Sequence, residues 1–189
     1  LELRSAPRLS VRKSTSGMRL TVDGIAPGYA VDRIATELRA LGHANFIVEI
    51  GGEVRAAGQR QEGGPWRIAI EAPLATRREP LVGLRLRDAA VSTSGDYRDV
   101  RIDADGHRYS HTIDPRTGRT TSSALTSVTV IDANAIRADA YATALMVMGT
   151  EAGLAWAQAQ RVPALFVERT LQPGEWRVVA SPAFAEWRD

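Results

Sequence analysis

The chain has 189 residues, of which 24 are Lys or Arg and 22 are Asp or Glu, so its formal net charge is +2. Hydrophobic residues make up 44%, which excludes a disordered chain, and no run approaches the roughly 20 apolar residues of a membrane-spanning helix. The absence of cysteine excludes disulfides, thiolate catalysis and Cys-ligated metals. The small charge excess does not indicate a nucleic-acid partner. We expect a single domain over residues 1–189.

The predicted elements follow one another without an internal repeat. Residues 1–17 predict an extended lead-in, residues 18–23 alternate like a strand, and residues 24–28 form a glycine-rich turn. An amphipathic helix is expected over residues 29–41, ending at Gly42. Its apolar face comprises Val31, Ile34, Leu38 and Leu41.

The remaining elements are mostly strands. Strands are expected at residues 46–50, 53–57, 66–70, 81–87, 89–93, 108–113, 126–131, 165–168 and 176–180, the last two as a hairpin. Turns are expected at residues 92–96 and 114–118, and helices at residues 134–148 and 151–160. Runs of antiparallel strands with few helices predict an α+β fold, a mostly antiparallel sheet with two or three helices packed on it.

One acidic residue, Asp139, stands inside a run of small and apolar residues. A helix that is apolar on nearly every face is buried, and Asp139 and Thr143 share a face because they are four residues apart. A buried carboxylate is costly unless it is hydrogen-bonded, paired or bound to a metal. A carboxylate beside a hydroxyl suits Mg²⁺ held partly by a phosphate ligand. The alternative is a hydrogen bond to a neighbouring loop or an ion pair, for example with Arg137.

His111 is the histidine with the most suggestive surroundings. On the predicted strand it shares a face with Tyr109 and Ile113, and the turn at Asp114-Pro115 follows at once. Such a histidine can act as a general base. It can equally be a core histidine bonded to a backbone carbonyl, and the spacing leaves both open.

Three segments with glycine would allow a ligand close to the backbone. Gly24 precedes a helix whose N-terminus can face an anion, and its carbonyl can serve a metal. The hydroxyls of residues 92–96 can donate to phosphate, and Gly51 and Gly52 permit contact with a flat ligand. Each segment also has an ordinary explanation: Pro27 at a helix start, a polar loop, and a tight bend.

Taken together, five segments in this order resemble the motifs of the ApbE family, the FAD:protein FMN transferases. They are GIAPGYAVD at residues 24–32, EIGGE at 49–53, STSGDY at 92–97, HTIDPRTG at 111–118 and ADAYATA at 138–144. The resemblance covers nearly the whole chain. It depends on the ordered set, since no single segment is specific.

The resemblance implies a Mg²⁺-dependent reaction in which FAD is cleaved at its pyrophosphate and AMP leaves. FMN is then joined through a phosphoester to a Thr or Ser of an acceptor flavoprotein subunit. The resemblance assigns Mg²⁺ to Asp139, Thr143 and the carbonyl of Gly24, and assigns action on the acceptor hydroxyl to His111. It places the protein in the periplasm, or anchored to the membrane and facing the periplasm. The positions that it assigns to FAD are Thr21, Pro27, Gly51, Gly52, Ser94, Gly95 and Ile113.

Three departures from the family pattern accompany the resemblance. Many relatives carry Asp at the position of Thr21 and Lys or Glu at the position of Pro27. Family members also have a long N-terminal segment, whereas this chain starts shortly before Gly24, so we expect it to be a C-terminal portion. Two other functions fit the sequence: an FAD pyrophosphatase, in which water replaces the acceptor hydroxyl, and a non-catalytic flavin-binding module.

Overall fold

The computed structural model describes residues 1–74, 76–97, 101–102, 108–109, 112–121, 124–172 and 174–189, with residues 101–102 and 108–109 described by their backbone alone. Its helices are α1 (Ala26–Ala40), α2 (Ala135–Met148), α3 (Thr150–Ala159) and the 3-10 helix η1 (Pro182–Trp187). Its strands are β1 (Glu2–Arg4), β2 (Ser10–Arg12), β3 (Phe46–Ile50), β4 (Glu53–Ala57), β5 (Trp66–Glu71), β6 (Pro80–Leu86), β7 (Ala89–Gly95), β8 (Arg101–Ile102), β9 (Arg108–Tyr109), β10 (Ile113–Asp114), β11 (Arg119–Thr120), β12 (Leu125–Asp132), β13 (Ala164–Arg169) and β14 (Trp176–Ala180).

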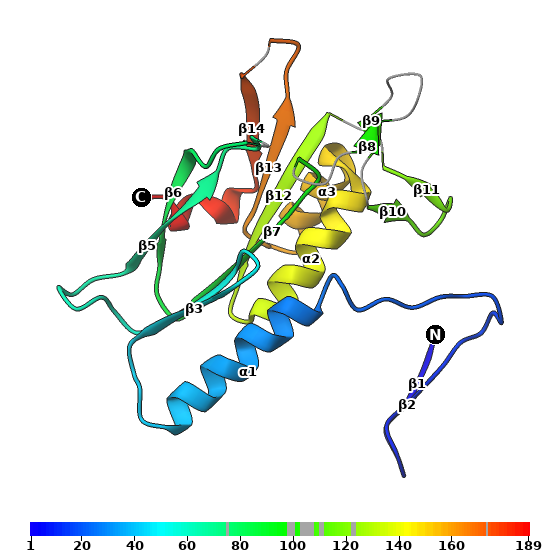
Figure 1. Ribbon diagram of the computed structural model, residues 1–189, viewed down its shortest axis with the longest axis horizontal. Helices are drawn as coiled ribbons and strands as arrows, with labels where there is room; N and C mark the ends of the chain where they lie inside the picture. The colour runs from blue at the N-terminus through cyan, green and yellow to red at the C-terminus, as the bar shows by residue number, and fades with distance from the viewer. Residues whose placement is uncertain (75, 98–100, 103–107, 110–111, 122–123, 173) are drawn as a thin grey trace.

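A six-stranded sheet forms the centre of the fold, in the order β14-β13-β12-β7-β4-β3, with every neighbouring pair antiparallel. α1 packs on β3 and β4 and α2 packs on β7 and β12, so both helices cover one face of the sheet (Figure 1). Side chains of β6 and η1 pack against the other face. The α+β class expected from the sequence is confirmed.

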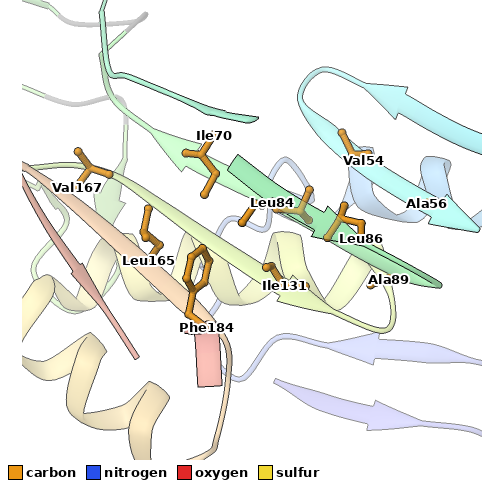
Figure 2. Close-up of a cluster of buried hydrophobic side chains, with 11 residues drawn as sticks. Val54, Ala56, Ile70, Leu84, Leu86, Ala89, Ile131, Leu165, Val167 and Phe184 are labelled. Atoms are coloured by element: carbon orange, nitrogen blue, oxygen red, sulfur yellow. The ribbon is translucent and has the colours of Figure 1, made fainter. Parts of the chain in front are cut away.

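The face opposite α1 and α2 carries a hydrophobic cluster (Figure 2). Leu84 and Leu86 of β6 and Phe184 of η1 are fully buried in it. Val54 and Ala56 of β4 reach the same cluster, because alternate residues of a strand point to the same face. Each fully buried Leu or Phe contributes about 2 kcal/mol, so the β5–β6 hairpin is held firmly as a third layer.

α1 and α2 approach closely where α1 presents a glycine. Gly28 is buried, and a Cβ at this position would lie 2.6 Å from the carbonyl oxygen of Ala135 and 2.9 Å from Cβ of Asp139. Only a residue without a side chain fits this contact. The close approach brings the start of α1 against the first two turns of α2.

The buried face of α1 differs from the one expected. Val31 is buried as predicted and Leu38 is half-buried against the sheet, but Ile34 is 42% exposed and Leu41 is also exposed. The buried residues of the helix are Gly28, Val31 and Ala35. Gly28 faces α2, where a side chain would not fit, whereas Ala35 packs against Phe46 and Ala57 of the sheet. The helix also begins at Ala26, three residues before the predicted start, with Pro27 in its first turn.

Two local predictions are wrong because sheet pairing decides them. Residues 18–22 form no strand, and no strand of the described residues pairs with them. The strand expected at residues 89–93 continues to Gly95 as β7 instead of giving way to a turn at residues 92–96, since Thr93 and Ser94 pair with Thr129 and Val128 of β12. A polar, glycine-containing sequence thus continues as a strand because β12 pairs with it, although β4 pairs with β7 only as far as Val91.

The N-terminal lead-in and the segment before the 114–118 turn also differ from expectation. Residues 1–17 contain the short β1–β2 hairpin, which lies apart from the central sheet (Figure 1). In place of one strand over residues 108–113, β9 pairs with β8 and β10 pairs with β11, while residues 110–111 lie outside the described part. The expected turn is confirmed: the Gly118 N–H donates to the Asp114 carbonyl oxygen at 2.8 Å.

The other predicted helices and strands form close to their expected bounds, whereas β8, β11 and η1 were not expected. α2 and α3 match the two C-terminal helices, and β13 and β14 form the predicted hairpin. Within the described ranges, no helix combines the length and the apolar character needed to cross a membrane.

We expect Gly28→Ala to lower the free energy of unfolding by about 1–2 kcal/mol, because overpacking against the Ala135 carbonyl outweighs the gain in helix propensity. Urea unfolding followed by circular dichroism measures the change. The control is Gly17→Ala, since a Cβ at Gly17 meets nothing within 4 Å. Equal stability of the two variants would contradict the close helix contact.

Candidate active site

The Asp139 side chain lies at the contact between α1 and α2. It is only 4% exposed, and its Oδ2 accepts a hydrogen bond of 3.0 Å from the N–H of Gly28. Oδ1 makes no hydrogen bond to any residue that the structure describes. The carboxylate therefore has one oxygen held by the start of α1 and one available to a ligand.

Thr143 lies one turn further along α2, against Gly24 and β7. Its hydroxyl is 3.1 Å from the hydroxyl of Ser94, and a Cβ on Gly24 would lie 2.9 Å from Thr143 Oγ1. The absence of a side chain at Gly24 lets its backbone approach this hydroxyl. The structure thus brings together Gly24, Asp139 and Thr143, the three residues assigned to the metal, which we call the Asp139 group. Ser94 lies beside them.

A second buried carboxyl group, that of Glu53, lies beside this set. Glu53 is the first residue of β4, is 8% exposed, and accepts a hydrogen bond of 3.2 Å from the Ser92 hydroxyl. Sequence analysis assigned it no role, although it directly follows Gly51-Gly52. The sequence signal that could have identified Glu53 is strand alternation. Glu53 shares a face of β4 with Arg55 and Ala57, and this face packs against the helices.

Burial raises the pKa of both carboxyl groups. For Asp139 the cause is desolvation, partly offset by the hydrogen bond from the Gly28 N–H, which favours the charged form. For Glu53 the pKa is raised first by desolvation and then by the negative charge of Asp139, against a smaller opposing effect of Ser92. Two neighbouring buried carboxylates repel each other, and a cation between or beside them would relieve that cost.

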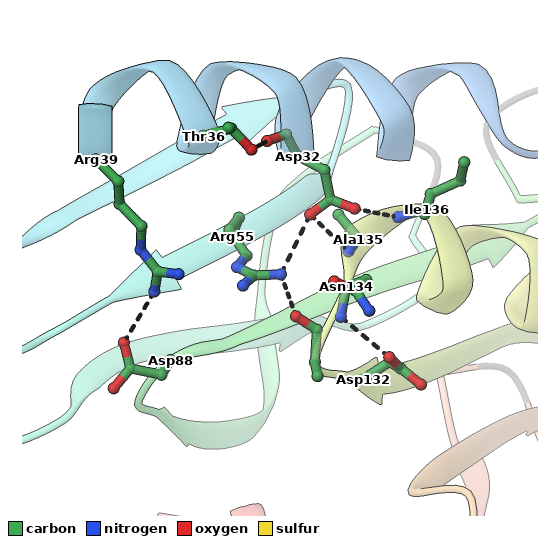
Figure 3. Close-up of polar contacts among 10 residues, drawn as sticks. Asp32, Thr36, Arg39, Arg55, Asp88, Asp132, Asn134, Ala135 and Ile136 are labelled. Atoms are coloured by element: carbon green, nitrogen blue, oxygen red, sulfur yellow. Dashed lines mark hydrogen bonds and ion pairs between the residues drawn. The ribbon is translucent and has the colours of Figure 1, made fainter. Parts of the chain in front are cut away.

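The start of α2 is fixed by an aspartate of α1. The Asp32 carboxylate accepts hydrogen bonds of 3.0 Å from the backbone N–H groups of Ala135 and Ile136, and forms an ion pair of 3.2 Å with Arg55 (Figure 3). The Arg55 guanidinium also donates to the carbonyl of Ala133. Sequence analysis missed this contact because it joins residues about a hundred positions apart.

The ion pair considered for Asp139 does not form. Arg137 pairs instead with Asp132 at 3.2 Å and lies over the ring of Tyr141. Asp139 is held by a backbone N–H and by no arginine of the described residues.

A cavity of about 620 Å³ opens on the opposite face of the sheet, between the sheet and the β5–β6 hairpin. This volume falls within the range of small-molecule pockets. Its walls include Gly51, Gly52 and Gly95, three of the positions assigned to FAD. The other lining residues are Ile47, Glu49, Val54, Ile68, Ala69, Ile70, Glu71, Arg78, Val91, Thr93 and Tyr97.

Two pairs of consecutive residues connect the cavity with the Asp139 group. Gly52 lines the cavity and the next residue, Glu53, lies beside Asp139. Gly95 lines the cavity and the residue before it, Ser94, contacts Thr143. Because neighbouring residues of a strand point to opposite faces, the ends of β4 and β7 connect the two regions.

The remaining predicted positions are dispersed. Thr21 is exposed and its hydroxyl accepts from the Asp23 N–H, and Pro27 is half-buried in the first turn of α1 next to Gly28. Ile113 is 57% exposed in β10. His111 lies outside the described residues. The structure therefore gathers the metal and glycine positions but places neither Thr21 nor Ile113 in the cavity wall.

Comparison with known proteins identifies the family. The sequence profile of the ApbE family matches residues 1–166. The chain belongs to the ApbE family. The FAD:protein FMN transferase of Vibrio cholerae is 42% identical over 179 residues, which are 86% of this chain and 53% of the relative. The Haemophilus influenzae protein of the same name is 36% identical over 166 residues, 86% of this chain and 47% of the relative.

Solved ApbE structures have the same fold. The apo flavinyl transferase ApbE of Pseudomonas stutzeri superposes with a TM-score of 0.76 at 43% identity, covering 89% of this chain and 51% of that protein. The ApbE protein of Thermotoga maritima gives 0.79 at 30% identity, covering 92% and 55%. The chain spans about half the length of the relatives that it matches.

The Asp139 group fits a hard divalent cation. Among the described residues no three His, Cys, Asp or Glu side chains gather in a metal-binding arrangement. The group offers one carboxylate oxygen, one hydroxyl and a nearby backbone, which are oxygen ligands of the kind that Mg²⁺ prefers. Such a set leaves positions open for phosphate oxygens and water. A cation-free site of this kind should be electrostatically strained at neutral pH.

We expect Asp139→Asn and Glu53→Gln to stabilise the metal-free chain by about 1 kcal/mol at pH 7. Both native carboxyl groups have raised pKa values, so their folded forms favour the proton. The native chain should therefore lose stability as the pH rises through those raised values, and the amide variants should not. Urea unfolding in EDTA between pH 4 and 8 measures the difference.

The control for these variants is Glu37→Gln, which removes an exposed carboxyl group paired with Arg33 on α1. Parallel pH curves for the native chain and both amide variants would refute the buried-charge description.

Proposed function

We propose that this chain binds FAD and Mg²⁺ and takes part in transferring the FMN moiety of FAD to a Thr or Ser hydroxyl of an acceptor flavoprotein, with release of AMP. The observation that carries the proposal is the Asp139 group: a buried carboxylate with one free oxygen, the Thr143 hydroxyl one turn away, and the Gly24 backbone against that hydroxyl. The names of the relatives support the same reaction.

The proposed reaction exchanges one phosphorus–oxygen bond for another. The acceptor oxygen bonds to the phosphorus of the FMN moiety, the bond from that phosphorus to the bridging oxygen breaks, and AMP leaves with that oxygen. Bound Mg²⁺ would neutralise the pyrophosphate charge and hold it for in-line displacement. The family resemblance gives the acceptor proton to His111, and general-base assistance of this kind typically contributes about 10²–10⁴-fold.

The chain's own residues provide the binding geometry. Asp139 would direct its free oxygen to the cation while the Gly28 N–H keeps the side chain in place. Gly51 and Gly52 add no side chain to the cavity wall where a flavin or phosphate would approach the Asp139 group, whereas at Gly95 the ring of Tyr97 lies where a side chain would be. Pro27 costs the helix no hydrogen bond, because N–H groups of the first turn have no partner within the helix.

The test is to incubate the chain with FAD, Mg²⁺ and an acceptor protein that carries a flavinylation Thr. AMP release together with covalent flavin on the acceptor is the expected result. Free FMN and AMP without labelled acceptor would instead identify an FAD pyrophosphatase. Binding of FAD without AMP release would identify a flavin-binding module, the outcome favoured if the rest of the relatives' length is needed for catalysis.

By the family analogy we propose that the reaction takes place in the periplasm.

We expect Thr143→Val to fold and to lose most of the stabilisation by Mg²⁺, because valine keeps the shape of threonine but has no oxygen ligand. Free Mg²⁺ at a hundred times its Kd would stabilise the native chain by about 2.7 kcal/mol. Thermal melting with and without Mg²⁺ measures the effect. The matched control is Thr129→Val, which removes a hydroxyl paired with Thr93 at 2.8 Å in the sheet. Equal responses to Mg²⁺ in both variants would exclude Thr143 as a ligand.

We expect His111→Ala to slow acceptor modification by at least about 10²-fold while FAD affinity stays within about twofold of the native value. Single-turnover labelling of the acceptor and titration of flavin fluorescence separate the two effects. A comparable loss of both would make His111 a structural residue.

A further inference from the structure

α1 and α2 cap each other through two aspartates. Neither Ile25 nor Asn134, the residues at their N-caps, makes a side-chain capping bond. The first-turn N–H groups of α2 donate instead to Asp32 of α1, and the Gly28 N–H of α1 donates to Asp139 of α2. Each carboxylate meets the positive end of the other helix's dipole.

The two capping contacts lie one helical turn apart on both helices. Asp32 is four residues after Gly28 on α1, and Asp139 is four residues after Ala135 on α2. Four residues of α-helix span about 6 Å. Two attachments at this spacing fix both the axial register and the rotation of α2 against α1, which a single attachment would leave free.

Arg55 of β4 prevents Asp32 from swinging away. The ion pair is mostly buried, with side chains 12% and 21% exposed, and the guanidinium also holds the Ala133 carbonyl just before α2 (Figure 3). The Thr36 hydroxyl donates to the Asp32 carbonyl oxygen at 2.8 Å. Sheet, α1 and the start of α2 therefore converge on one carboxylate.

We propose that Asp32 is a positioning residue for the Asp139 group. By capping α2, Asp32 fixes the positions of Asp139 and Thr143 relative to Gly24. Gly24 lies two residues before α1, whereas Asp139 and Thr143 belong to α2, so their geometry depends on the register of the two helices. Among the described residues, no hydrogen bond or ion pair joins Asp32 to any of the three. The inference rests on the proposed function for the identity of the ligand, and on the capping contacts for the positioning.

The test compares Asp32→Ala and Asp32→Asn with the native chain in two measurements. Mn²⁺ binding, followed by electron paramagnetic resonance, should weaken about tenfold in the alanine variant, the lower end of losses seen for residues that support metal ligands. Backbone amide exchange at Gly28 should accelerate, although Asp139, the acceptor of that N–H, is unchanged. The asparagine variant keeps one acceptor and should lie between the two, and it remains informative if the alanine variant fails to fold.

The matched control is Asp88→Asn. Asp88 also accepts a backbone N–H, from Gly58 at 3.0 Å, and pairs with an arginine, Arg39, at 3.3 Å (Figure 3). No hydrogen bond or ion pair of the described residues joins it to α2 or to the Asp139 group. It should leave both Mn²⁺ affinity and Gly28 exchange unchanged.

Two failures can be told apart. If Asp32→Ala lowers only the unfolding stability, with native Mn²⁺ affinity and native Gly28 exchange in the folded protein, the positioning role is overturned. If the native chain itself binds no Mn²⁺, the proposed function fails. The exchange of Gly28 still decides whether Asp32 controls the place of Asp139.

Discussion

The reciprocal capping of α1 and α2 by Asp32 and Asp139 is the interaction on which the candidate site depends. It satisfies first-turn N–H groups that neither helix can satisfy with its own cap residue. It also requires the helices to come so close that only glycine fits at position 28. The Asp139 carboxylate thereby holds α1 with one oxygen, while its other oxygen makes no hydrogen bond to the described residues.

The same arrangement explains why the site carries unfavourable charge. Asp139 and Glu53 are buried close enough for the charge of one to raise the pKa of the other, and no arginine of the described residues pairs with either. Arg55, the nearby cation, is committed to Asp32. Two buried carboxyl groups without a cationic partner destabilise a fold, whereas a cation site requires carboxylates that are charged and shielded from water.

The two faces of the central sheet carry different parts of the proposed site. One face carries the helices and the Asp139 group, and the other carries the cavity under the β5–β6 hairpin. The strand ends at Gly52-Glu53 and Ser94-Gly95 belong to both regions, because successive residues of a strand point to opposite faces. Gly52 adds no side chain at the first of these ends, and the ring of Tyr97 covers Gly95 at the second.

The sequence by itself determined the α+β class and the helices and strands with strong periodicity. It also determined that Asp139 and Thr143 share one helix face, because spacing along a helix is a local property. The tertiary structure alone decided that the strand begun at Ala89 continues through residues 94–95, that residues 18–22 form no strand, and that Asp32, Arg55 and Glu53 surround the site. These outcomes depend on sheet neighbours and on contacts across some twenty to over a hundred residues. Such contacts leave no periodic signal in the sequence, since they exist only once the chain has folded.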